Sequence, residues 1–252
     1  MTYLTNYHTH TKGCHHARGE ERQYVECAIK AGLKELGFSD HAPYVFDGNY
    51  DSGYRMYLDQ TEEYKNSVLA LKEEFKSDIK IYFGFELEYY KKTFKKELAY
   101  LKQFDYDYLI LGQHFVGGEP DGTYVAYLQG DDALTQYVDE CIEALSTGEF
   151  KYIAHPDIAN YKFTPSVVDR EYTRLLEFCK ENDYPVEINV LGIQTNRWYP
   201  KRKFFELAEK VGTKVIIGID AHTPNSISKE SYGLAKDLVK GLDLNIIDRL
   251  VI

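Results

Sequence analysis

Short apolar runs alternate with amphipathic segments seven times along the chain, and this alternation limits the possible folds more than any other feature. The predicted strands cover residues 3–7, 35–39, 79–87, 106–111, 152–154, 185–190 and 214–219. The predicted helices cover residues 20–31, 56–75, 92–102, 131–145, 169–181, 201–211 and 231–239. Such an alternation predicts a parallel sheet with the helices packed outside it. We expect an α/β fold, a closed or nearly closed TIM-like barrel; an open doubly wound sheet is the alternative, disfavoured because no glycine-rich nucleotide loop follows the first strand.

Composition excludes several classes of protein. The 252 residues are 44% hydrophobic and 28% charged, which suits one globular domain over residues 1–252. The net charge of −10 argues against a broad nucleic-acid surface, and no apolar run is long enough to cross a membrane. Four cysteines without a C-x-x-C pair, and an N-terminus without a secretory signal, predict reduced thiols and a cytoplasmic location. The oligomeric state stays open.

The histidines share one position relative to the predicted strands: each lies at a strand end or just after it. They are His8, His10, His15, His16, His41, His114, His155 and His222. Glu86 lies near the end of the third strand, and Asp220 follows the seventh. Because the carboxyl ends of barrel strands meet on one face, these side chains should share one cleft. Imidazole and carboxylate ligands suit Zn, Mn or Fe, so we expect a site for more than one metal ion.

Individually, several of these residues have ordinary alternatives. A single histidine at the start of a loop can cap a turn or lie on the surface. Asp40 can orient His41, cap the next turn or donate a proton. Cys14 is expected to pack near the site rather than to act as a nucleophile. Of the adjacent pair His15 and His16, only one is expected to face the site.

The motifs in chain order resemble those of the polymerase-and-histidinol-phosphatase (PHP) superfamily, and within it the monofunctional histidinol-phosphate phosphatases. They are HTHT (8–11), CHHA (14–17), GFSDHAP (37–43), GFELEY (84–89), QHF (113–115), AHPD (154–157), EIN (187–189) and DAH (220–222). These motifs span nearly the whole chain. The resemblance implies a distorted (β/α)7 barrel with three divalent metal ions at the C-terminal ends of the strands.

The resemblance also implies a ligand set, with Glu86 and Asp220 as the catalytic carboxylates. The first metal would be held by His8, His10, Glu86 and Asp220. Glu86 would bridge to a second metal held by His114 and His155. The third would be held by His16, His41 and His222, because the family spacing selects His16 over His15.

The implied activity is hydrolysis of L-histidinol phosphate to L-histidinol and phosphate, a step of histidine biosynthesis, through attack by a metal-bridging hydroxide. The partner is then a small phosphate ester and not a nucleic acid. The alternatives are a phosphoesterase acting on another small phosphate ester or nucleotide, and a metal-binding regulatory protein without turnover.

The segment after the sixth strand departs from the family pattern. Members often carry a Gly-Leu-Arg-Lys-like stretch there, whereas here Arg197 is displaced and lies beside Trp198. Arg197 is the candidate to bind the substrate phosphate, because a guanidinium matches two phosphate oxygens. Its alternative roles are stacking on Trp198 or a surface salt bridge, and Arg18 is the next candidate.

Overall fold

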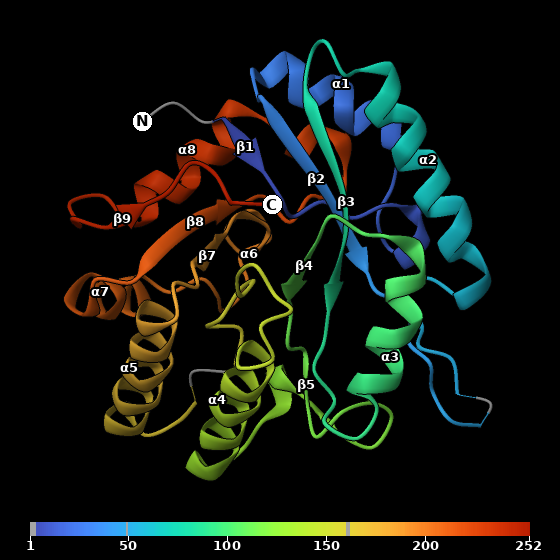
Figure 1. The fold of residues 1–252 in the computed structure, drawn as a ribbon. Helices are drawn as coiled ribbons and strands as arrows, with labels where there is room; N and C mark the ends of the chain where they lie inside the picture. Colours follow the sequence, from blue (N-terminus) through green and yellow to red (C-terminus); the bar gives the residue numbers. More distant parts are fainter. Residues whose placement is uncertain (1–3, 49, 160–161) are drawn as a thin grey trace.

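A parallel sheet curls into a barrel with helices around its outside (Figure 1). The computed structural model describes residues 4–48, 50–159 and 162–252, so the first residue of the predicted strand 3–7 lies outside the described residues. The parallel strands are β1 (Thr5–Asn6), β2 (Glu35–His41), β3 (Lys80–Leu87), β4 (Tyr108–Leu111), β7 (Val186–Asn189), β8 (Lys214–Gly218) and β9 (Asn245–Ile246).

Single residue pairs complete the barrel between the longer strands. Strands β1 to β4 are neighbours in chain order, and so are β7 to β9. Ile153 joins the two groups by pairing with Leu111 and Val186, so the fifth predicted strand is reduced to one paired residue. Thr9 pairs with Ala221, which closes the barrel beyond the ends of β1 and β8. The predicted distorted (β/α)7 barrel is therefore confirmed.

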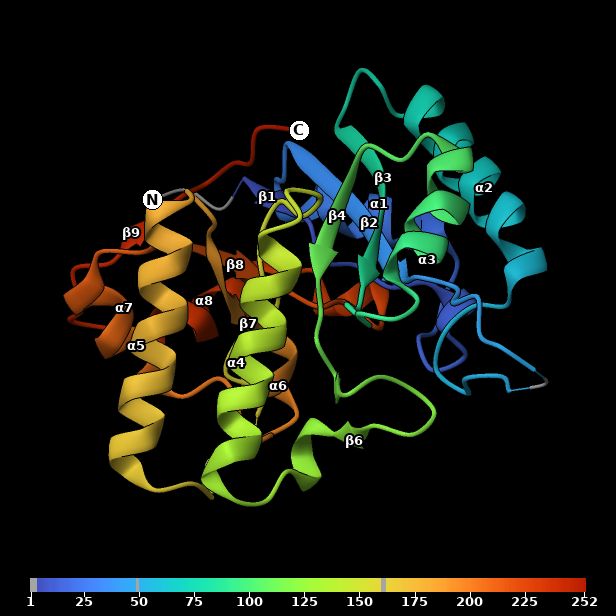
Figure 2. The ribbon, with the colours of Figure 1, turned by 60° about the horizontal axis from the view of Figure 1, so that its bottom comes forward.

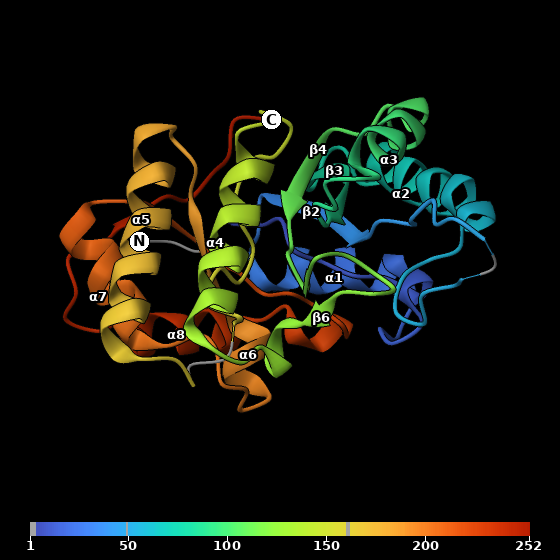
Figure 3. The same ribbon diagram turned by 90° about the horizontal axis from the view of Figure 1, so that it is seen from below.

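The helices lie outside the strands, with α4, α5 and α7 at one end of the molecule and α2 and α3 at the other (Figures 2 and 3). They are α1 (Glu21–Ala31), α2 (Thr61–Glu74), α3 (Phe94–Leu101), α4 (Asp131–Leu145), α5 (Pro165–Glu181), α6 (Val190–Gln194), α7 (Arg202–Val211) and α8 (Lys229–Leu238). Among the described residues, no helix combines the length and apolar composition needed to span a membrane.

Two helix starts differ by about one turn from the sequence-based prediction, whereas the other five lie within two residues of it. The helix predicted from residue 56 begins at Thr61, because a 3-10 turn at Leu58–Gln60 precedes it. The helix predicted from residue 169 begins at Pro165, one turn earlier. Proline fits the first turn of a helix because the amide hydrogen that it lacks has no partner there in any case.

Besides the 3-10 turns, four short elements have no counterpart among the predicted ones. Strand β5 (Phe115–Val116) pairs with β6 (Thr123–Tyr124) in an antiparallel hairpin that follows the end of β4. Helix α6 begins directly after β7, where the Asn189 side chain accepts a hydrogen bond from the Gly192 amide. Strand β9 pairs with β8 near the C-terminus.

Tyrosines fill the interior of the barrel. The buried cluster there consists of Tyr7, Tyr82, Tyr108, Ile110, Tyr152, Ala154 and Ile216. The Tyr108 hydroxyl donates to the Tyr7 carbonyl at 2.7 Å, and the Tyr152 hydroxyl donates to Glu187 at 3.3 Å. Buried tyrosine hydroxyls need such partners.

Gly84 lies where β3 and β4 approach each other closely, and it pairs with Tyr108. A Cβ at this position would lie 2.6 Å from the ring carbon Cδ1 of Tyr108 and would also meet its carbonyl oxygen. We expect Gly84→Ala to lower the free energy of unfolding by about 1–3 kcal/mol through overpacking. Gly233→Ala in α8, where nothing lies within 4 Å, should instead raise it by about 0.5–1 kcal/mol. Urea unfolding measures the free energy of unfolding of both variants. Equal changes in the two would contradict the claim that β3 and β4 leave no room for a side chain at residue 84.

Candidate metal centre

A cavity of about 320 Å³ opens at the C-terminal ends of the strands. Eight of the nine predicted metal ligands line it: His10, His16, His41, Glu86, His114, His155, Asp220 and His222. The ninth, His8, is completely buried and contacts Glu86 and Asp220. The barrel therefore brings together all nine side chains from segments more than two hundred residues apart.

Glu86 lies at the centre of this cluster and is 1% exposed. Its Oε1 is 2.8 Å from His155 Nε2, and its Oε2 is 3.0 Å from His41 Nδ1. The ring nitrogens of His8 and His10 lie 3.5 Å from its oxygens, and that of His114 lies at 3.8 Å. Five imidazoles thus surround one carboxylate, so either oxygen of Glu86 could contact a metal ion that these rings also bind.

His8, His10 and Asp220 form a second part of the cluster. The Nε2 atoms of the two histidines are 3.1 Å apart. Asp220 Oδ1 lies 3.1 Å from the His10 nitrogen and 3.5 Å from that of His8. Three donor atoms that face one another at this distance could share one metal ion.

The adjacent histidines His15 and His16 lie in different surroundings. His16 Nε2 is 2.9 Å from His222 Nε2 at the cavity. The His15 ring packs against Tyr57, with ring centroids 4.6 Å apart, and does not line the cavity. The donor atoms of His222 fall within one group with His10 and His41 and within another with Cys14 and His16, so the possible ligand groups overlap.

Four buried atoms of the cluster form no hydrogen bond of acceptable geometry, although three of them lie within ion-pair distance of another member. They are His41 Nδ1 and Glu86 Oε2, which are 3.0 Å apart, Asp220 Oδ1, which is 3.1 Å from His10 Nε2, and His155 Nδ1. Buried polar atoms normally have hydrogen-bond partners because leaving them unpaired is costly. Carboxylate oxygens and imidazole nitrogens are ligands that Zn and related ions take. These residues therefore fit divalent metal ions.

The carboxylates and imidazoles change one another's pKa values. Burial alone would raise the pKa of Glu86 and of Asp220, but the surrounding imidazoles lower both well below their usual range. Burial would lower the pKa of His8, yet three adjacent carboxylates raise it to about 10. Burial and two neighbouring histidines lower the pKa of His16 to about 4. A metal ion that binds here would displace protons from some ligands.

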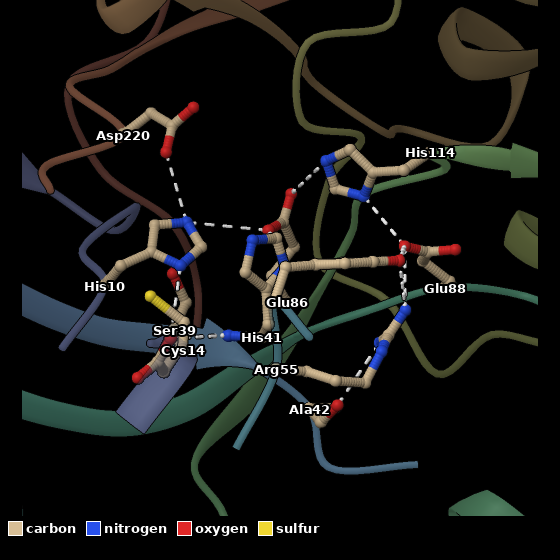
Figure 4. Close-up of polar contacts among 12 residues, drawn as sticks. His10, Cys14, Ser39, His41, Ala42, Arg55, Glu86, Glu88, His114 and Asp220 are labelled. Atoms are coloured by element: carbon tan, nitrogen blue, oxygen red, sulfur yellow. Dashed lines mark hydrogen bonds and ion pairs between the residues drawn. The ribbon is translucent and has the colours of Figure 1, made fainter. Parts of the chain in front are cut away.

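Two further carboxylates contact the outer ring nitrogens of two candidate ligands. Glu187 lies 2.8 Å from His8 Nδ1. Glu88 lies 2.9 Å from His114 Nδ1, a contact that Figure 4 shows. Such contacts fix the orientation of a ligand ring and raise its basicity. Both residues fall within the sequence motifs, but their roles were not predicted because alternation along a strand does not reveal which carboxylate faces which ring.

Asp40 and Cys14 support the loop that carries His16. Asp40 Oδ1 lies 3.2 Å from His10 Nδ1 and accepts a hydrogen bond from the His41 amide at 2.8 Å. Asp40 therefore orients the ring of His10, whereas it contacts only the backbone of His41. Cys14 is fully buried and its thiol donates to the Thr11 carbonyl at 3.1 Å.

Arg197 lines the cavity, but it does not stack on Trp198. Its Nη1 donates to the Tyr199 hydroxyl at 2.8 Å, and its guanidinium lies 5.9 Å from the Tyr199 ring centre. The Trp198 indole donates to the Ile158 carbonyl instead. The alternative candidate, Arg18, does not line the cavity. Sequence reasoning missed four aromatic residues that do, namely Tyr54, Phe115, Tyr124 and Tyr199.

Comparisons with known proteins agree with this geometry. A protein of Deinococcus radiodurans named "Probable histidinol-phosphatase" is 31% identical over 246 residues, which cover 94% of each chain. The histidinol-phosphatase of Lactococcus lactis is 29% identical over 234 residues, covering 86% of this chain and 83% of the relative.

A solved structure shares the fold. Histidinol phosphate phosphatase from Lactococcus lactis, complexed with Zn, L-histidinol and phosphate, gives a TM-score of 0.75 at 19% identity and covers 99% of both chains. The PHP domain matches residues 6–190, well over half of the sequence. With the near-full-length relative from Deinococcus radiodurans, this match confirms the resemblance, and the chain belongs to the PHP domain family.

Proposed function

We propose that this protein is a metal-dependent phosphomonoesterase that hydrolyses L-histidinol phosphate to L-histidinol and phosphate. The cluster of seven histidines, Glu86 and Asp220 at one cavity carries the proposal. The near-full-length relatives named histidinol-phosphatase support the choice of substrate. The Zn in the complex from Lactococcus lactis supports a metal-dependent reaction.

The proposed ligand assignment uses three divalent ions, with Zn, Mn and Fe as candidates. His8, His10, Glu86 and Asp220 would hold the first ion, and His114 and His155 would share Glu86 to hold the second. His16, His41 and His222 would hold the third. Bound divalent ions lower the pKa of a coordinated water and withdraw charge from phosphoryl oxygens.

The remaining residues supply orientation. Glu187 and Glu88 keep the rings of His8 and His114 fixed through hydrogen bonds of 2.8 and 2.9 Å. Arg197 extends a guanidinium into the cavity and is proposed to bind two peripheral oxygens of the phosphate. The substrate is thus a small molecule rather than a nucleic acid, which agrees with the net charge of −10. We further propose one domain over residues 1–252, located in the cytoplasm.

A substrate panel tests the proposed function. Protein purified without chelator should contain more than one equivalent of Zn, Mn or Fe and should hydrolyse L-histidinol phosphate with a higher kcat/KM than nucleotides, sugar phosphates or an aryl phosphate. Removal of the metal should abolish turnover, and its return should restore it. A preference for another ester would identify a different phosphoesterase. Tight metal binding without any turnover would identify a regulatory protein.

The two adjacent histidines offer a matched pair of variants. We expect His16→Asn to lower kcat by more than about 100-fold, because the loss of a ligand should exceed the 10–100-fold typical of residues that only support ligands. His15→Asn should remain within about 10-fold of wild type. Asparagine tolerates the left-handed backbone of His15, where φ is 64°. Kinetics and elemental analysis measure both variants, and a larger effect at His15 would overturn the assignment.

Arg197→Lys tests the proposed phosphate contact. Lysine keeps the charge but loses the planar fork, so kcat/KM should fall about 10–150-fold, which corresponds to about 1.5–3 kcal/mol for a hydrogen bond to a charged group. The metal content should not change. Arg18→Lys is the matched control, because Arg18 does not line the cavity. Wild-type kinetics in Arg197→Lys and Arg197→Ala would assign the contact elsewhere.

A further inference from the structure

Arg55 is buried beside the candidate metal centre and contacts two carboxylates. Its side chain is 2% exposed. Nη2 lies 3.1 Å from Glu88 Oε1 and 2.6 Å from Glu119 Oε2. The guanidinium also packs 4.6 Å from the centre of the Tyr54 ring. We call this arrangement the Glu88–Arg55–Glu119 bridge; Figure 4 shows its Glu88 and Arg55 members.

Glu119 connects two segments that come from different β/α units. It lies in the turn between β5 and β6, and its side chain is 2% exposed. Its oxygens accept hydrogen bonds from the hydroxyls of Tyr50 at 2.7 Å, Ser52 at 3.0 Å and Tyr54 at 2.8 Å. These three residues belong to the segment between β2 and α2. Glu119 therefore ties the β5–β6 hairpin to that segment.

The two connected segments form one side of the cavity. Tyr54, Phe115 and Tyr124 line it, and we call them the aromatic wall. The rings of Tyr54 and Phe115 are nearly parallel, at 11°, with centroids 6.1 Å apart. The ring centroids of Phe115 and Tyr124 are 5.5 Å apart. The wall adjoins the metal ligands, because the Tyr54 ring lies 5.3 Å from that of His41.

The bridge places two carboxylates around one guanidinium in the interior. Buried ion pairs cost desolvation and are weak evidence of stability, but they can define one conformation. Both carboxylates accept hydrogen bonds from the hydroxyls of Tyr54 and Tyr90. They differ in their other contacts: Glu88 lies 2.9 Å from His114 Nδ1, whereas Glu119 accepts from Tyr50 and Ser52 of the segment between β2 and α2.

We infer that Glu119, acting through Arg55, is a positioning residue that fixes the aromatic wall for the alcohol half of the substrate. The imidazole ring carried by the alcohol half of L-histidinol phosphate is flat and, when protonated, cationic, so it can stack on tyrosine and phenylalanine rings. The wall therefore favours phosphate esters of alcohols that carry an aromatic ring or a cationic group. We expect binding of the phosphate group to be independent of the wall. The inference rests on the proposed function and names the part of the cavity that selects the substrate.

Glu119→Gln tests, in one experiment, whether binding of the alcohol half of the substrate changes while binding of phosphate does not. Glutamine keeps the shape of the side chain but removes the charge that pairs with Arg55. We expect KM for L-histidinol phosphate to rise about 10–100-fold, as for other supporting residues. The inhibition constant of inorganic phosphate, which probes the phosphate site alone, should stay within about threefold. The metal content should not change.

Two further variants control for folding. Glu171→Gln removes an equally buried carboxylate that pairs with Arg174 on α5, so it should lower the melting temperature but leave KM unchanged. Tyr50→Phe removes one hydroxyl contact of the partly exposed Tyr50 and should raise KM in the same direction by less, which keeps the test valid if Glu119→Gln fails to fold.

The outcomes separate the inference from the proposed function. A rise in KM at an unchanged phosphate inhibition constant supports the inference. Equal changes in both constants, or no change in either, overturn it while the proposed function stands. A wild-type protein that hydrolyses no phosphomonoester overturns the proposed function and, with it, the basis of the inference.

Discussion

One buried carboxylate, that of Glu86, is surrounded by five imidazoles, and the arrangement of the rest of the site depends on it. Strand β3 lies between β2 and β4, so Glu86 points from the middle of the sheet toward candidate ligands on several strands. Gly112 leaves room for it, because a Cβ there would collide with the Glu86 carboxylate. The barrel brings the strand ends together on one face, and the absence of a side chain at residue 112 leaves space for the Glu86 carboxylate.

Burial of so many acidic groups requires positive charge within the same volume. The surrounding imidazoles hold the pKa values of Glu86 and Asp220 well below their usual range despite burial. Divalent ions would supply positive charge in the same volume and take the imidazoles as ligands. Glu187 and Glu88 contact the outer ring nitrogens of His8 and His114 and orient these rings. The buried carboxylates of the candidate site are stable only because positive charge lies beside them, which an apolar interior would not provide.

The sequence predicted the features that depend on regular geometry. Histidines at the ends of five predicted strands, together with Glu86 in the third and Asp220 after the seventh, implied one shared cleft, because parallel strands carry their ends to one face. It did not predict the β5–β6 hairpin, whose two-residue strands are too short for a visible alternation. Nor did it predict the partner of Asp40, since the contact with His10 depends on how two adjacent strands pack. The roles of Arg55 and Glu119 depend on long-range ion pairs that leave no local pattern.

Anomalous X-ray diffraction from crystals of protein purified without chelator tests the central claim most directly, because it locates metal ions independently of activity. The account predicts three anomalous peaks at the C-terminal ends of the strands, each about 2.0–2.2 Å from imidazole nitrogens or carboxylate oxygens. Two of the ions should both contact the Glu86 carboxylate, and His16 rather than His15 should contact the third ion. Peaks confined to other parts of the surface, or a fully active crystal without any peak in this cluster, would contradict it.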